Sequence, residues 1–248
     1  NKTIAIGAGN MVWYIVDLET MNEVKFTTGG DSFAVSSYRF TSDLQYIICS
    51  TSSSNIVFWK ISNSSKYVFK SKFSANIVVP LKNDIFLFYF RSQFYDKSGS
   101  TKVLRVYFYK EDKFFDLIGH EDRITCVVGS SSGKYALSGG DDNVVYIWDL
   151  HSVSCNMKLV GHTKSVLAVD INQNETMVIT SSSDKSIIIW GFKTGKKIHT
   201  ISNLLNDFNQ LYFTSCSTYF FALSENVNYF SVWDSKTFNH VSDFYFSP

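Results

Sequence analysis

The most constraining feature of this chain is a set of polar and aromatic residues that occurs twice. Each copy contains a Gly-His pair, a hydroxyl-bearing residue, an aspartate, and a tryptophan that ends an apolar run. The second histidine, aspartate and tryptophan each follow the first by 42 residues, so the copies are units of one repeat. A period of roughly 40–45 residues predicts units of four short β-strands. The two sets are His120, Ser138, Asp142 and Trp148, and then His162, Thr180, Asp184 and Trp190.

Each repeat contains four runs that are rich in β-branched and aromatic residues and separated by polar turns, as expected of strands. We expect strands at residues 124–128, 134–138, 144–148 and 156–160 of the first repeat, and at 166–171, 176–180, 186–190 and 197–201 of the second.

The same template, moved along the chain, predicts six such units. The position of the tryptophan falls at or near the end of an apolar run each time, at intervals of about 40 to 49 residues, as repeated four-stranded units require. The six positions are Val16, Trp59, Phe108, Trp148, Trp190 and Trp233.

The spacing of Gly-His, Asp and Trp resembles the repeat of the WD-repeat (WD40) family. The resemblance implies an all-β fold, a WD40-type β-propeller in which each unit is one blade. It also implies that the His, Ser or Thr, Asp and Trp of a blade form a buried hydrogen-bonded chain. Such a chain is physically reasonable, because a carboxylate and an imidazole between apolar sheets must satisfy each other. Ser, His and Asp also form hydrolase triads, but recurrence in register favours the structural role.

The whole chain is expected to form a single propeller domain. Its first apolar run, Thr3 to Gly7, corresponds to the second strand of a blade. Because a propeller closes to protect its strand edges, we expect polypeptide upstream of Asn1 to complete a ring of about seven blades. A six-bladed ring closed by this chain alone is the alternative.

The composition argues against several classes of partner. A formal net charge of +1 gives no broad positive field, so we do not expect nucleic acid to bind. The longest apolar run, residues 77–90, is interrupted by charged and polar residues, and we expect no membrane insertion. The 4 cysteines lack metal-ligand spacing, which predicts buried free thiols in an intracellular, reducing compartment. No catalytic or cofactor motif is present, and we expect neither enzyme activity nor a cofactor.

A longer segment in the third unit is a candidate binding site. The interval from Trp59 to Phe108 is 49 residues, and the excess falls in residues 91–101, between the second and third strands. Aromatic and arginine side chains are enriched at interface centres, although the segment could also be a longer solvated hairpin whose aromatics fold back on the blade. The resemblance places this turn on the same face as the linkers between blades. The candidate contacts are Arg91, Phe94, Tyr95, Lys97, Glu121, Asp122, Arg123 and Lys164.

These features together predict a non-catalytic scaffold that presents a rigid surface to other proteins in an intracellular complex. A structural subunit of a large assembly is the alternative. A propeller enzyme or a nucleic-acid-binding platform is a more distant one.

Overall fold

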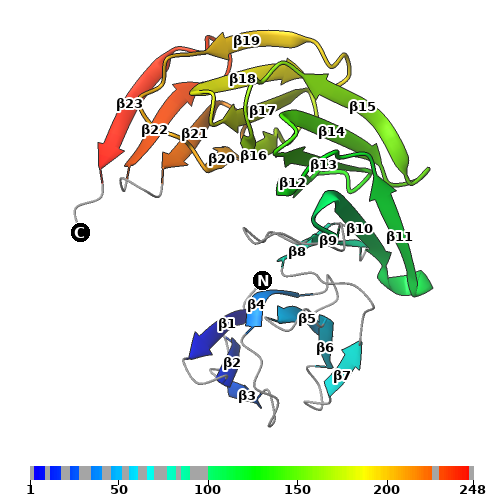
Figure 1. Cartoon of the computed structure of the whole chain (residues 1–248). Helices are drawn as coiled ribbons and strands as arrows, with labels where there is room; N and C mark the ends of the chain where they lie inside the picture. The colour runs from blue at the N-terminus through cyan, green and yellow to red at the C-terminus, as the bar shows by residue number, and fades with distance from the viewer. Residues whose placement is uncertain are drawn as a thin grey trace.

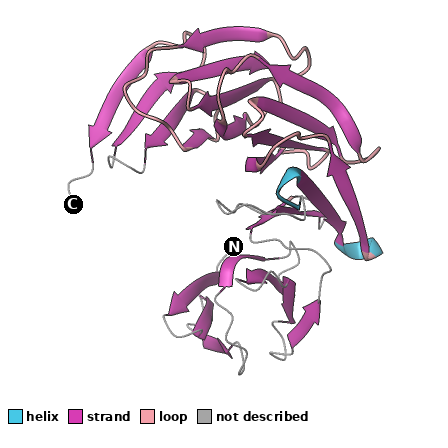
Figure 2. Cartoon of the chain, in the orientation of Figure 1, coloured by secondary structure: helices cyan, strands magenta, loops and turns pink. Residues whose placement is uncertain are grey.

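The structure, a computed structural model, consists of short antiparallel strands. It describes residues 3–8, 12–17, 23–27, 35–40, 46–51, 56–60, 66–69, 77–81, 85–89, 100–224 and 229–245. Side chains are described for residues 46–48, 77–81, 85–89, 101–224 and 229–245. Figure 2 shows strands throughout the described part, with two 3-10 turns at Ser100–Lys102 and Tyr109–Glu111.

The strands form six sheets, each of which contains strands that are consecutive in the chain. The first sheet holds β1 (Thr3–Ala8), β2 (Val12–Asp17) and β3 (Glu23–Thr27), and the second holds β4 (Val35–Phe40), β5 (Tyr46–Thr51), β6 (Ile56–Lys60) and β7 (Lys66–Phe69). The third holds β8 (Ile77–Pro80), β9 (Ile85–Tyr89), β10 (Val103–Phe108) and β11 (Lys113–Ile118). The fourth holds β12 (Ile124–Gly129), β13 (Tyr135–Gly140), β14 (Val144–Asp149) and β15 (Ser154–Val160). The fifth holds β16 (Val166–Ile171), β17 (Met177–Ser182), β18 (Ser186–Gly191) and β19 (Lys197–Ile201), and the sixth holds β20 (Gln210–Phe213), β21 (Tyr219–Ser224), β22 (Tyr229–Asp234) and β23 (His240–Tyr245).

The sheets follow one another around an arc, as the blades of a propeller do (Figure 1). Strands β4, β8, β12, β16 and β20 each contact the next of the series, and they line the inner side. Strands β11, β15, β19 and β23 lie on the outer side. The all-β propeller predicted from the repeat is therefore confirmed.

The third strand of a sheet is buried on both faces, which explains its nearly continuous apolar sequence. In β14, Val145 and Ile147 pack against the fifth sheet, whereas Tyr146 and Trp148 pack against the third. Each sheet thus turns its tryptophan face toward the preceding sheet, and one apolar layer fills each space between blades. Burial of this kind, at about 25 cal/mol per Å² of apolar surface, is the main stabilising contribution in such a fold.

Pairing of the strands repeats in detail. The register between the third and fourth strands shifts immediately before Trp148, Trp190 and Trp233. Such a bulge adds a residue on one strand and increases local twist. All eight strands predicted in the two repeats are present, with ends that differ by at most two residues.

The expectation that the cysteines are buried is wrong for two of them. Cys155 and Cys216 are free and exposed, and Cys126 is free and partly buried. Cys155 lies on the outermost strand of its blade, and Cys216 lies in the turn between β20 and β21. Both positions face away from the layers between sheets, which a count of cysteines does not reveal.

Two further features concern the chain as a whole. The first sheet has three described strands, with Val16 on the central strand β2. This agrees with the assignment of the first strand to the second position of a blade, and completion of the ring by upstream polypeptide stays a prediction. Among the described residues, no helix has the length and apolar character needed to span a bilayer.

Candidate functional site

The topology places two kinds of loop at one end of every sheet. Because the four strands run up and down in order, the linker that enters a sheet and the turn between its second and third strands share that end. The two predicted histidine sets lie just beneath this surface, which we call the loop face. Its described parts include the linker residues 119–123 and 161–165 and the turns 141–143 and 183–185.

The first histidine set forms the predicted chain. Nδ1 of His120 lies 2.8 Å from Oδ2 of Asp142, and its Nε2 lies 2.8 Å from Oγ of Ser138. The indole N–H of Trp148 donates to the same Ser138 oxygen over 2.8 Å. The side chain of His120 is 0% exposed, so the polar chain is enclosed by the apolar layer.

The pattern of donors determines where the protons lie. An indole nitrogen can only donate, so Ser138 accepts from Trp148 and must direct its own hydroxyl proton elsewhere. His120 Nε2 is its other printed neighbour within hydrogen-bond distance, and that nitrogen therefore accepts. The Nδ1–H of the neutral ring then donates to Asp142, which satisfies all members of the chain.

The second set reproduces this geometry 42 residues later. His162 Nδ1 lies 2.9 Å from Asp184 Oδ2, and its Nε2 lies 2.8 Å from Thr180 Oγ1, to which Trp190 donates over 2.8 Å. Ser186 adds a hydroxyl that donates to Asp184 over 2.6 Å. Burial lowers the pKa of His162 despite the opposing effect of the Asp184 carboxylate, so its ring is neutral at pH 7.

Both aspartates stay ionised because hydrogen bonds outweigh burial. Burial alone would raise the pKa of Asp142, but His120 and the backbone amides of Glu121 and Val144 donate to it and lower the pKa below its usual value. The pKa of Asp184 is lowered in the same way, against burial, by donors that include Ser186 and the Thr163 amide.

The same carboxylates attach the linkers to the turns. Asp142 Oδ2 accepts the Glu121 amide at 3.0 Å, so a linker residue and a turn residue are joined. Arg123 reinforces the junction through Nε, which lies 2.8 Å from Asp141 Oδ2. Lys102, at the start of β10, donates to the Glu121 carbonyl over 2.6 Å and connects the third sheet to this linker. The loop face is therefore held rigidly from below.

Some of the predicted partner-binding residues lie on this face. Glu121, Asp122 and Lys164 are exposed, and the side chain of Arg123 is 28% exposed while it pairs with Asp141. The insertion does lie between the second and third strands of the third sheet, β9 and β10. Its candidate contacts fall outside the described residues: Arg91, Phe94, Tyr95 and Lys97.

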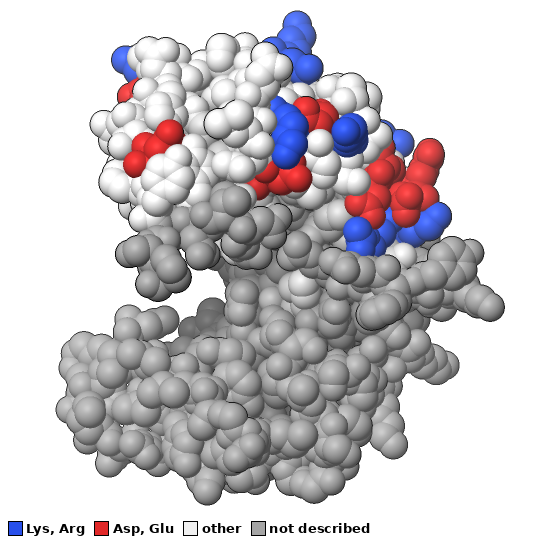
Figure 3. Space-filling model, turned by 60° about the vertical axis from the view of Figure 1, so that its left-hand side comes forward, with Lys and Arg blue, Asp and Glu red and all other residues white. Residues whose placement is uncertain are grey.

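Charge on the described surface is mixed. Figure 3 shows acidic and basic side chains beside one another on the face it presents, with uncharged areas between them. In the part of the chain that the structure describes, no three His, Cys, Asp or Glu side chains lie close enough together to hold a metal ion.

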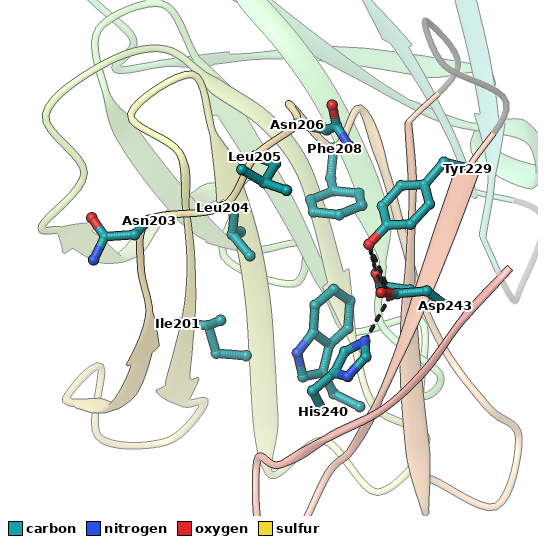
Figure 4. Close-up of a pocket in the computed structure, with 11 residues that line it drawn as sticks. Ile201, Asn203, Leu204, Leu205, Asn206, Phe208, Tyr229, His240 and Asp243 are labelled. Atoms are coloured by element: carbon teal, nitrogen blue, oxygen red, sulfur yellow. Dashed lines mark hydrogen bonds and ion pairs between the residues drawn. The ribbon is translucent and has the colours of Figure 1, made fainter. Parts of the chain in front are cut away.

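Sequence reasoning missed a pocket between the fifth and sixth sheets. It has a volume of roughly 310 Å³, and Figure 4 shows its lining residues as sticks. Three polar side chains on one wall, Tyr229, His240 and Asp243, are joined by hydrogen bonds. The available signal was the lack of a histidine set in the sixth unit, which is a departure from the repeat rather than a motif.

Comparisons with known proteins agree with this architecture. The family model described as "WD domain, G-beta repeat" matches residues 112–149 and 153–191. The chain is 30% identical over 84 residues to "Protein tipD" of Dictyostelium discoideum, an alignment that covers 34% of this chain and 14% of that protein. It is 22% identical over 142 residues to "GID complex subunit 7" of Schizosaccharomyces pombe, covering 56% of this chain and 28% of the relative. The chain thus spans well under half the length of these two relatives.

A solved structure extends the likeness to nearly the whole chain. A chain in "Crystal Structure of Mitotic Checkpoint Complex" superposes with a TM-score of 0.77 at 17% identity, and the superposition covers 97% of this chain and 73% of that one. At this identity the likeness concerns the fold alone. The repeated histidine sets, the matched family model and the six consecutive sheets lead to one assignment: this chain is a WD-repeat protein with a β-propeller fold.

Proposed function

We propose that this protein is a non-catalytic scaffold whose loop face binds other proteins in an intracellular multiprotein complex. The observation that supports this most directly is the attachment of exposed linkers to a rigid base. Glu121 and Thr163 each donate a backbone amide to a buried aspartate, at 3.0 Å in both cases. Side chains next to them therefore project from fixed positions, which reduces the entropy that binding would cost.

The histidine sets themselves favour a structural role over catalysis. Each imidazole is enclosed and both ring nitrogens have partners within 2.9 Å. A nucleophilic Ser or Thr would need access to a substrate, but Ser138 and Thr180 are 0% exposed. The printed names of similar proteins, a complex subunit and a component of a checkpoint complex, are consistent with a role in assemblies.

A cross-linking pull-down from the native source tests the proposal. The loop-face variant carries Asp122→Lys and Lys164→Glu, which leaves the net charge unchanged. The matched control carries Glu111→Lys and Lys193→Glu, which are exposed residues in turns between third and fourth strands, at the opposite end of the sheets. We expect partners to cross-link near residues 119–123 and 161–165, and to be lost only from the loop-face variant.

Retention of every partner by the loop-face variant, or equal loss from both variants, would overturn the assignment of this face. A further variant with Phe94→Ala and Tyr95→Ala tests the insertion separately. Loss of a partner from that variant alone would place the contact on residues 91–101.

A further inference from the structure

The pocket between the fifth and sixth sheets exists because bulky groups found in the earlier blades are replaced. Strand pairing identifies the equivalent positions, since Tyr146 pairs with Lys158 and Ser231 pairs with Asp243 at the same distance from the tryptophan. In the fourth sheet the Tyr146 ring stacks on Trp148, with ring centroids 5.1 Å apart. Ser231 puts only a hydroxymethyl group in this place.

The histidine is also missing from the sixth unit. The residue 43 positions after His162 is Leu205, whose side chain points into solvent at 92% exposure. Ala222 occupies the place of Ser138 and Thr180, two residues after the partner of the tryptophan in each blade. The sixth blade therefore keeps its tryptophan but has neither the imidazole nor its hydroxyl partner, and the vacated volume opens beneath the linker 202–209.

The walls of this volume are apolar on one side and acidic on the other. Ile201, Leu204 and Phe208 line it together with Trp233, whose ring lies edge-on to Phe208 at 5.7 Å. Figure 4 shows Asp243 between Tyr229 and His240 on the opposite wall.

One oxygen of this carboxylate is already occupied. Oδ1 of Asp243 accepts from Tyr229 over 2.8 Å, from His240 Nε2 over 2.7 Å, and from Ser231. In the described part of the structure, no hydrogen bond is made to Oδ2. Burial would raise the pKa of Asp243, but the donors Ser231, His240 and Tyr229 lower it, so the group carries a negative charge at neutral pH.

We propose that this pocket binds an arginine side chain of a partner protein. The aliphatic stem would lie along Leu204, Phe208 and Trp233, and the guanidinium would donate to Oδ2 of Asp243. Arginine suits these surroundings better than lysine because its weakly hydrated planar group packs against aromatic rings while it donates to a carboxylate. The pocket rests on the proposed function only in that the arginine belongs to a protein partner, and it is a different site from the loop face.

The test uses small probes on the purified full chain, so that it does not depend on any cellular partner. N-acetyl-L-arginine amide is titrated while the indole N–H signal of Trp233 is followed by NMR. N-acetyl-L-citrulline amide, which is neutral and nearly the same in shape, is the matched probe. We expect the arginine probe to bind at least about tenfold more tightly than the citrulline probe, which corresponds to about 1.4 kcal/mol.

Variants separate the carboxylate from the cavity. Asp243→Asn keeps an oxygen for the three internal donors and should weaken the arginine probe about tenfold, whereas Asp122→Asn, an exposed residue elsewhere, should not. Ser231→Tyr should refill the space as Tyr146 does and abolish the shift of Trp233, and thermal unfolding verifies that both variants are folded. Equal binding of the two probes, or unchanged binding by folded Asp243→Asn, would overturn the proposal, and neither result would affect the loop face.

Discussion

The carboxylate of Asp184 and the imidazole of His162 are 22 residues apart in sequence and 2.9 Å apart in the fold. The pair connects the turn that follows β17 to the linker that precedes β16, so one buried contact fixes the position of two loops. Asp142 and His120 form the same contact at 2.8 Å in the preceding blade. The residues that stabilise each blade thus also determine the shape of the loop face.

Replacing Asp184 with Ala should destabilise the protein without creating a specific functional defect. The substitution leaves the His162 Nδ1–H and the amides of Thr163 and Ser186 without their acceptor. Each unsatisfied buried donor costs about 1–3 kcal/mol, and partial access of water to the turn keeps the total near 2–4 kcal/mol. Urea unfolding measures the change. Asp122→Ala, on the exposed part of a linker, should change the free energy of unfolding by less than about 0.5 kcal/mol, and equal effects would contradict the structural role.

Asp170→Asn should stabilise the protein above pH 6. Asp170 Oδ2 accepts the Phe213 amide at 2.6 Å across two blades, yet burial raises the pKa of Asp170 to about 6. The unfolded chain loses this proton near its model value of 3.8 and the folded chain near 6, so stability falls as pH rises between those values. Asparagine still accepts from Phe213 and is never charged, which should add about 1–3 kcal/mol at pH 7.5.

Thermal unfolding of both proteins between pH 4 and 7.5 tests this prediction. The difference between Asp170→Asn and the wild-type chain should shrink as pH falls and approach zero near pH 4. A difference that does not depend on pH would show that the carboxyl group does not titrate in the folded state as expected.

The sequence was sufficient to predict the blades where the repeat is strict. His120 and His162, with their partners, lie where the 42-residue spacing placed them, because a buried polar chain allows few substitutions and leaves a clear pattern. The third-strand positions were found as well, because a strand buried on both faces is apolar along its length, as β14 and β18 show.

What the sequence did not indicate was the consequence of a missing set. That Leu205 points outward and Ser231 leaves room beside Trp233 follows from packing between two sheets, not from either residue's type. The exposure of Cys155 likewise depends on its place on an outer strand. Such features arise from contacts between segments that are about 40 residues apart, and no local pattern encodes them.

Cys216 should be the thiol that alkylates fastest among the three free cysteines described, Cys126, Cys155 and Cys216. Hydrogen bonds, the largest with Thr214 and the next with Thr218, lower the pKa of Cys216 to about 7, and the side chain is exposed. About half of its molecules are therefore thiolates at pH 7, the form that attacks iodoacetamide. Mass spectrometry of peptides after timed alkylation measures the rates. Thr214→Val should slow modification of Cys216 severalfold and leave Cys155 unchanged; the same rate in both proteins would contradict the role of Thr214.

Gly119→Ala should destabilise the fourth blade because the glycine lies against two large buried rings. A Cβ at this position would approach Trp148 Cη2 and Tyr146 Cε1, both at 2.8 Å. Neither ring can move easily, since Trp148 is 1% exposed and Tyr146 is 2% exposed. Overpacking of this kind costs about 1–3 kcal/mol. Gly191→Ala is a matched control in which the new Cβ would meet the Thr194 hydroxyl at 2.6 Å, and that side chain lies in an exposed turn and can rotate away. Urea unfolding should give a large loss for Gly119→Ala and a small one for Gly191→Ala; the reverse order would show that the Gly-His pair is not selected by contact with the tryptophan.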